Sequence, residues 1–186
     1  MDEPPSLQDL LDGNARFVAE GWEPSDAEMS AWPVKRLAVV ACMDTRNAVE
    51  RVLGLAHGDA KIIRNAGALL DDGTLRSLLV AVHLLGVQEV CVLGHTDCGM
   101  TRVGRGDFSI ANNIARTTGV PLSEVMRPDF QRWLGGFEDV EAHVRRSVEL
   151  VRRHPYLPDD LAVYGLVYDN ATGRVRPVAG AETVPA

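Results

Sequence analysis

Apolar residues follow two different spacings along the first half of the chain. Short, largely apolar runs at 36–41 and 89–93 predict buried β-strands, because a strand covered on both faces has no polar side, and residues 61–64 predict a further strand. Between these runs, apolar residues recur at helical spacing over 47–55 and over 71–86. Strands that alternate with helices in this way are typical of βαβ units, in which the strands are parallel and the crossovers right-handed.

After Met100 the pattern weakens, although a helix is expected that begins at Asp107 or Ser109 and ends at Gly119, and another is expected over 137–154. The second of these is rich in Glu at its start and in Arg at its end, as the helix dipole favours.

The C-terminal part returns to strand patterning. Residues 161–168 predict a fourth strand, and the turn residues 169–173 lead into a short strand over 174–178. Pro177 is tolerated there if this strand forms an antiparallel edge. We therefore expect an α/β fold with a mostly parallel sheet in the order 2-1-3-4, a C-terminal antiparallel edge strand, and helices on its flanks.

The N-terminal segment has a different character from the rest. Residues 6–21 predict an amphipathic helix with Ser6 as N-cap and Asp9 as its capping-box partner, and residues 22–33 read as a linker. We expect 1–33 to form a helical arm and linker, and 34–186 to form one structural unit of the α/β type. The arm helix can pack either on its own domain or on a partner subunit, and the pattern favours neither.

Composition narrows the classes of function. The net charge of −7 argues against a nucleic-acid surface, which is usually basic, and no apolar run reaches the length needed to span a bilayer. The acidic N-terminus does not resemble a secretory signal. Three cysteines in such a chain indicate a reducing, cytoplasmic location, where thiols serve metals or catalysis more often than disulfides.

Candidate chemistry lies at the ends of the first and third predicted strands. Cys42 follows the first strand, while His95 and Cys98 follow the third. If these strands are neighbours, their carboxyl ends flank the point where strand order reverses, and the three side chains can converge on one ion. Two sulfurs and one nitrogen suit Zn²⁺, and three protein ligands leave its fourth position open for water.

The spacing of these residues resembles a known family. Three motifs are similar to those of the β-class carbonic anhydrases: Cys42-x-Asp44-x-Arg46, the run 64–67 (Arg-Asn-Ala-Gly) and His95-x-x-Cys98-Gly. The sequence around the two cysteines resembles the cab-type branch of that class. The resemblance implies that Cys42, His95 and Cys98 hold zinc, that Asp44 and Arg46 form a catalytic dyad, and that the chain forms homodimers or dimers of dimers.

The chain departs from the family at two points. Plant-type members carry a substrate-orienting glutamine shortly before the first cysteine, and the segment 30–36 has none here. The second asparagine of the usual Arg-Asn-x-x-Asn is also absent after Asn65.

The expected activity is reversible hydration of CO₂ to bicarbonate and a proton by zinc-bound hydroxide. Asp44 would accept a hydrogen bond from the hydroxide, and Arg46 would keep Asp44 charged and oriented. Asp44 could alternatively swing into the fourth zinc position. The competing functions are a carbonyl sulfide or carbon disulfide hydrolase on the same scaffold and a non-catalytic zinc-binding homologue. A nucleotide-binding domain is disfavoured, because no G-x-G-x-x-G or P-loop follows the first strand.

Other polar residues are expected to have minor roles. Cys91 lies within an apolar strand and is expected to be structural. Asp97 is expected to face away from the site or to cap the following turn. Arg64, Asn65 and Gly67 are expected to lie next to the cleft. Surface or helix-end positions are expected for the remaining histidines: His57, His83, His143 and His154.

Overall fold

The computed structural model describes residues 4–182, and the chain divides into two compact units, 1–31 and 32–186. In the first unit, α1 (Leu7–Glu20) begins at Ser6, whose side chain accepts a hydrogen bond from the Asp9 amide while the Asp9 carboxylate accepts one from the Ser6 amide. This is the predicted capping box. A short 3₁₀ helix, η1 (Pro24–Glu28), lies within the segment predicted as linker.

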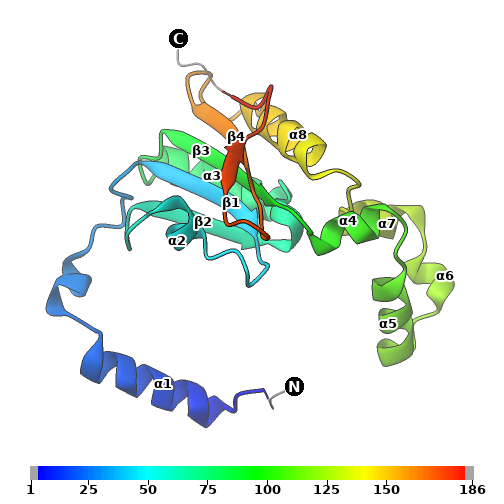
Figure 1. Ribbon diagram of the computed structural model, residues 1–186, viewed down its shortest axis with the longest axis horizontal. Coiled ribbons are helices and arrows are strands. Elements are labelled where there is room, and N and C mark those ends of the chain that lie inside the picture. The colour runs from blue at the N-terminus through cyan, green and yellow to red at the C-terminus, as the bar shows by residue number, and fades with distance from the viewer. Residues whose placement is uncertain (1–3, 183–186) are drawn as a thin grey trace. The chain divides into compact units, whose positions relative to one another are not determined.

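The second unit is built on a five-stranded sheet (Figure 1). The strand order is β2-β1-β3-β4-β5, with all neighbours parallel except β4 and β5, so the predicted topology is confirmed. The strands are β1 (Leu37–Cys42), β2 (Ala60–Asn65), β3 (Glu89–His95), β4 (Ala162–Tyr168) and β5 (Val175–Pro177).

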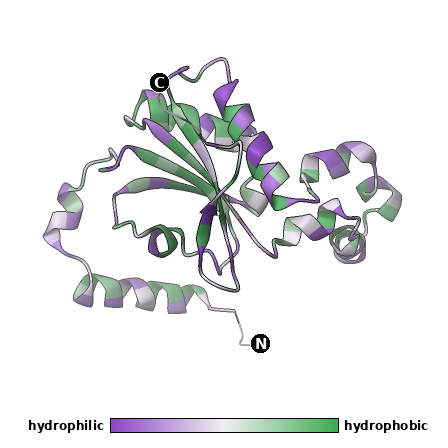
Figure 2. Ribbon diagram, turned by 45° about the horizontal axis from the view of Figure 1, so that its top comes forward, coloured by the Kyte–Doolittle hydropathy of each residue, from purple (hydrophilic) through white to green (hydrophobic). Residues whose placement is uncertain are grey.

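Helices cover both faces of the central strands, which explains why β1 and β3 are almost entirely apolar (Figure 2). On one face, α3 (Asp72–His83) and α8 (Val140–Arg152) pack against alternate residues of β1 and β3, such as Val40 and Val92. On the other face, α2 (Val49–Leu53) packs against the intervening residues, including Val39. Packing on both faces fixes the positions of these strands, and it thereby also positions the loops at their carboxyl ends.

The predicted helices exist but are shorter than expected. Gly54 adopts a left-handed conformation that ends α2 early, and α3 stops at His83 rather than Gly86. At their N-termini, Asp71 caps α3 and Asp139 caps α8, each accepting a hydrogen bond from a backbone amide three residues later.

Residues 99–134 contain more helix than the apolar pattern indicates. The predicted helix α5 (Ser109–Thr118) is present, and three short helices that the pattern did not predict accompany it. A helix of one or two turns has too few residues to establish a period. The additional helices are α4 (Gly99–Gly104), α6 (Leu122–Val125) and α7 (Pro128–Leu134).

Within residues 4–182, no helix combines the length and the apolar character that crossing a membrane requires.

Candidate metal centre

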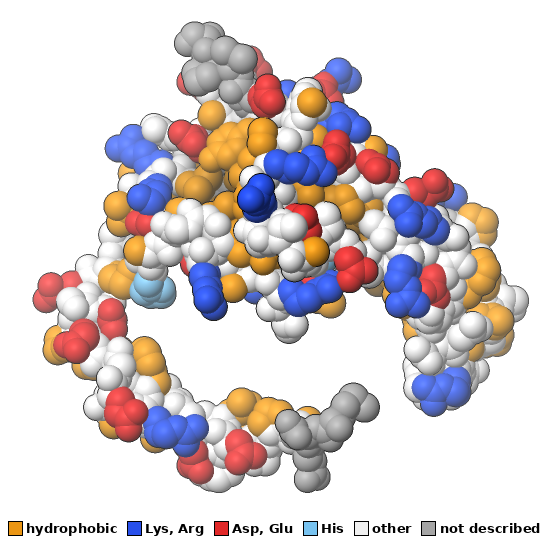
Figure 3. Space-filling model, in the orientation of Figure 1, with side chains coloured by type: hydrophobic (Ala, Val, Ile, Leu, Met, Phe, Trp, Pro, Cys, Tyr) orange, Lys and Arg blue, Asp and Glu red, His pale blue; other side chains and the backbone are white. Residues whose placement is uncertain are grey.

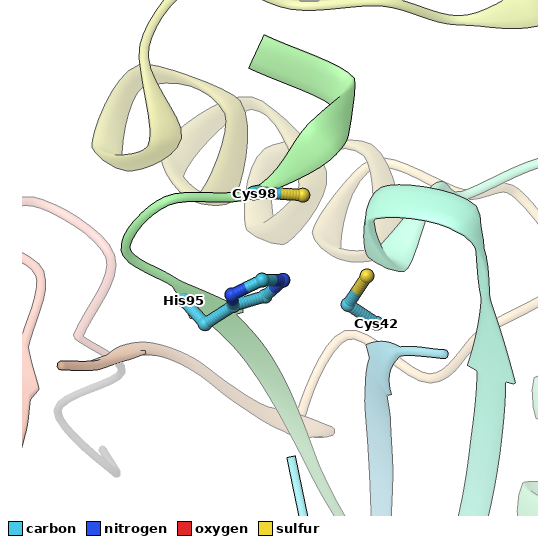
Figure 4. Close-up of side chains that lie close together, drawn as sticks. All are labelled: Cys42, His95 and Cys98. Atoms are coloured by element: carbon cyan, nitrogen blue, oxygen red, sulfur yellow. The ribbon is translucent and has the colours of Figure 1, made fainter. Parts of the chain in front are cut away.

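The structure brings the three predicted ligands together (Figure 4). Cys42 is the last residue of β1, His95 is the last residue of β3, and Cys98 immediately precedes α4. Because β1 and β3 are parallel neighbours, their carboxyl ends meet at one edge of the sheet. All three side chains are buried, and their ligand atoms lie within 4.8 Å of one another.

The imidazole of His95 is oriented by groups outside the cluster. Its Nδ1 lies 2.9 Å from the Thr96 carbonyl oxygen, and a proton on Nδ1 completes that hydrogen bond. The Asn170 side-chain amide donates to the same carbonyl at 2.7 Å and lies 3.0 Å from Nδ1. Nε2 then carries the free lone pair, and it is buried with no hydrogen-bond partner among the described residues. A buried nitrogen lone pair that faces two thiols is suited to binding a metal cation.

A hydrogen bond links the Cys42 and Cys98 side chains. A hydrogen bond from the Cys98 thiol lowers the pKa of Cys42 to about 4, and the same bond raises the pKa of Cys98. The Gly67 amide also donates to Cys42 Sγ, at 3.3 Å. Thiolate character is therefore present before any ion binds, and a bound cation would deprotonate the second thiol as well. Two sulfurs and one imidazole nitrogen, buried and aimed at one point, fit Zn²⁺.

Asp44 and Arg46 form a bidentate ion pair beside this cluster. Arg46 Nη2 lies 2.7 Å from Asp44 Oδ2, and Arg46 Nε lies 3.0 Å from Asp44 Oδ1. The hydrogen bonds from Arg46 lower the pKa of Asp44 to about 2, so the carboxylate is ionised at neutral pH. Its Oδ2 is 3.9 Å from His95 Nε2, which places a negative charge next to the ligand cluster.

The expectation that Asp97 faces away or caps the following turn is wrong. Its carboxylate lies 2.8 Å from Arg46 Nη1, its backbone carbonyl accepts a hydrogen bond from Arg46 Nη2 at 3.0 Å, and α4 has no side-chain cap. The two residues are 51 positions apart, so no local pattern in the sequence could reveal their contact.

Arg64 supports the loop that follows β1. Its guanidinium donates to the backbone carbonyls of Cys42 at 3.1 Å and Asp44 at 2.7 Å. Asn65 instead exchanges hydrogen bonds with Leu69, which shapes the segment around Gly67. Arg64 and Asn65 thus hold backbone near the site, whereas Gly67 itself lines the adjoining cavity.

His143 lies in the first turn of α8, which is one of the two positions expected for it, but its side chain is buried. It is 7% exposed, stacks on Phe137 with ring centroids 4.0 Å apart, and its Nε2 lies 3.0 Å from the Gly67 carbonyl oxygen. Burial lowers the pKa of His143, so the ring is neutral and donates to that carbonyl. His57 and His83 are exposed, and His154 is partly buried just after α8, as expected for such positions.

A cavity of about 780 Å³ opens in front of the ligands. Gly67 adopts a positive φ of 79° at its wall, and a Cβ there would lie 2.9 Å from atoms of both Met100 and Phe137. Most of the cavity wall is apolar, and the polar groups gather near the ion pair and at Arg102, Asp107 and Ser109. The apolar wall residues are Met43, Ala66, Met100, Val103 and Ile110.

Comparisons with known proteins agree with this architecture. The sequence model of the carbonic anhydrase family matches residues 37–175. Beta-carbonic anhydrase 1 of Mycobacterium tuberculosis is 38% identical over 146 residues, which cover 78% of this chain and 83% of that protein. The crystal structure of carbonic anhydrase from Streptococcus mutans superimposes with a TM-score of 0.74 at 33% identity, covering 95% of this chain and 99% of that one.

Enzymes with another substrate share the scaffold. A carbon disulfide hydrolase of Acidithiobacillus thiooxidans is 31% identical over 153 residues, which cover 77% of each protein. The family match spans both ligand loops and the whole sheet except the last residues of β5. The chain therefore belongs to the β-carbonic anhydrase family.

Proposed function

We propose that this protein catalyses the reversible hydration of CO₂ to bicarbonate and a proton, using zinc held by Cys42, His95 and Cys98. One observation carries the proposal: His95 Nε2 is buried without a hydrogen-bond partner among residues 4–182, and it lies within 4.8 Å of two thiol sulfurs, next to an ionised carboxylate. Two thiols and an imidazole are suited to binding a metal cation, and a purely structural metal site would not require the neighbouring pair of Asp44 and Arg46.

Asp44 is the catalytic residue in this proposal. Cys42, His95 and Cys98 would hold the zinc ion, and the bound ion would acidify a water molecule so that it could act as the nucleophile. An ionised carboxylate can only accept hydrogen bonds, so Asp44 accepts one from the attacking water molecule. This hydrogen bond orients the water so that a lone pair of the water oxygen points toward the substrate carbon. With Oδ2 3.9 Å from His95 Nε2, the carboxylate lies close enough to border the cation position.

Arg46 and the cavity wall complete the site. The two hydrogen bonds from Arg46 keep Asp44 ionised and fix the orientation of its carboxylate plane. The cavity wall includes the apolar residues Ala66, Val103 and Ile110. A wall of this kind suits a small, linear, uncharged substrate.

The proposal includes assembly into a homodimer, with pairing of dimers as a further step. The five large apolar side chains of α1 are each more than half exposed, and Figure 3 shows hydrophobic and acidic side chains interspersed on this helix. These five are Leu7, Leu10, Leu11, Phe17 and Val18. An amphipathic helix with this much exposed apolar surface is stabilised by packing against a partner. Sedimentation velocity should find a dimer, and deletion of residues 1–31 should shift it toward monomer.

The proposed location is the cytoplasm. Cys42, Cys91 and Cys98 are all free thiols, and the proposed ligands work only when they are reduced.

Hydrolysis of carbon disulfide or carbonyl sulfide is the second candidate, favoured by the carbon disulfide hydrolases among the relatives. These substrates are also linear and apolar, so the same cavity can admit them. Stopped-flow measurement of CO₂ hydration with a pH indicator, beside sulfide release from COS and CS₂, separates the two. We expect CO₂ to give the highest kcat/KM, and a higher value for either sulfur substrate would reverse the assignment.

Zinc analysis completes the test. We expect about one zinc per chain in protein prepared under reducing conditions. Zinc-loaded protein that accelerates none of the three reactions would identify a non-catalytic zinc-binding homologue instead.

A further inference from the structure

We propose that Asp97 is a positioning residue for the catalytic pair: it holds the Arg46 guanidinium in the orientation that grips Asp44. The proposal rests on the proposed function, because it assigns Asp97 a role in that reaction. Asp97 lies between two proposed ligands, His95 and Cys98, yet its carboxylate contacts Arg46.

The hydrogen bonds of Arg46 divide between two loops. Toward the loop after β1, Nε and Nη2 donate to the two oxygens of Asp44 at 3.0 Å and 2.7 Å. Toward the loop after β3, Nη1 donates to Asp97 Oδ2 at 2.8 Å and Nη2 donates to the Asp97 carbonyl at 3.0 Å. The guanidinium therefore spans both loops, and its plane is defined from two sides.

The loop after β3 restrains the Arg46 side chain in a way that Asp44 alone cannot. Asp44 and Arg46 are two residues apart on one loop, so their pair can turn together without breaking its hydrogen bonds. The Arg46 side chain is 48% exposed, and an exposed arginine loses considerable rotamer freedom when it is held in one geometry. Asp97 anchors it to a segment that begins at the end of the buried strand β3.

The backbone of Asp97 also fits this role. Its φ is +54°, a left-handed conformation that costs most residues free energy but that aspartate and asparagine tolerate. This conformation accompanies the contact in which the Asp97 carbonyl, as well as the carboxylate, accepts from Arg46. An uncommon backbone conformation at a residue between two ligands is consistent with selection for that contact.

The expected effect is moderate, because the Asp97 side chain is 78% exposed and water screens the pair. The variant Asp97→Asn keeps the side-chain shape and the tolerance for positive φ while removing the charge. In the zinc-loaded full-length protein it should lower kcat for CO₂ hydration about three- to tenfold. KM should stay near the wild-type value, because the Asp44 orientation matters in the transition state rather than in substrate binding.

A second readout follows Arg46 itself. In ¹⁵N-edited NMR spectra, the Nη groups of a guanidinium held on two sides rotate slowly about their bonds to Cζ. Asp97→Asn should accelerate this rotation for Arg46 and leave the zinc content at the wild-type value. Asp129→Asn is the matched control, because Asp129 pairs with Arg127 on the surface, where both side chains are about 60% exposed. It should change neither kcat nor the Arg46 signals.

A double-mutant cycle tests whether Asp97 acts through Arg46. In the Arg46→Ala background, Asp97→Asn should lower kcat no further. An equal loss in both backgrounds, a loss of zinc in Asp97→Asn, or unchanged Arg46 rotation would each overturn the proposal. If the wild-type protein hydrates no CO₂, the proposed function fails, while the NMR comparison still decides whether Asp97 holds Arg46.

Discussion

The candidate centre has two parts that differ in how they are held. The proposed ligands Cys42, His95 and Cys98 are at most 6% exposed and lie at the ends of two buried strands or just beyond them. The neighbouring Asp44, Arg46 and Asp97 are joined by charge, and their side chains are 19%, 48% and 78% exposed.

The two parts are positioned by different interactions, the first by backbone pairing between strands and the second by ion pairs at the surface. Strand pairing places the buried ligands, because β1 and β3 are parallel and in register from Leu37 and Glu89 to Ala41 and Leu93. The exposed ion network contributes little to folding, since water screens each pair. Changes in the ligand cluster should therefore have large effects on metal binding, and changes in the network should act on turnover.

The largest effect is expected from Cys98→Ser. A serine hydroxyl remains protonated where the thiol would lose its proton to zinc, so zinc binding should weaken by about 100-fold or more and turnover should vanish. Elemental analysis after dialysis measures the zinc content, and circular dichroism checks the fold. Wild-type zinc content in this variant would break the comparison, because Cys98 would then not be a ligand.

Asp44→Asn should have the next largest effect, and it should separate the two parts. The amide keeps the size of the side chain but cannot serve as an ionised acceptor, so kcat/KM should fall by about 10²-fold while zinc stays bound. The measurement is CO₂ hydration with zinc-replete protein. Unchanged turnover would mean that Asp44 has no part in the chemistry.

His143→Leu tests the packing behind the ligand cluster. The substitution leaves the Gly67 carbonyl without the donor that now lies 3.0 Å from it, and an unpaired buried acceptor costs about 1–3 kcal/mol. Urea denaturation should show this loss in the free energy of unfolding. The exposed His57 is the control, and His57→Ala should change stability by less than about 0.5 kcal/mol. Equal stability of His143→Leu and wild type would show that the contact is dispensable.

Asn47→Leu should change stability in the opposite direction. Asn47 is fully buried, and neither polar atom of its side chain has a hydrogen-bond partner among the described residues. Leucine has a similar volume and no polar group to desolvate, so the variant should be more stable by about 1–2 kcal/mol. Thermal and urea unfolding measure the change, and a less stable variant would show that the amide contributes to the fold.

Cys91 should show no response at all, and this sharpens the contrast between the buried thiols. It is 1% exposed, and burial raises its pKa to about 12, so it stays protonated through pH 9. After zinc removal, iodoacetamide at pH 8.5 should modify Cys42, whose pKa is lowered and which lines the cavity, and should leave Cys91 intact in the folded protein. Mass spectrometry of peptides reads the sites, and modification of Cys91 would contradict its structural role.

Much of the fold could be predicted because it depends on local periodicity. The apolar runs around Val39 and Val92 identify strands that are covered on both faces. Asp71 stands at the start of α3, where its side chain accepts a hydrogen bond from the Thr74 amide. The short helices α4, α6 and α7 could not be found this way, because each is too short to display a period and depends on its surroundings.

The sequence by itself determined where the strands lie and that Cys42, His95 and Cys98 stand at or just after their ends, because apolar periodicity is a local property of the chain. Only the tertiary structure decided what supports them. Asn170 reaches the Thr96 carbonyl beside His95 from 74 positions away, and Asp97 reaches Arg46 from 51. Such contacts depend on how separate loops meet above the sheet, and hydrogen-bond geometry between distant residues leaves no periodic trace in the chain.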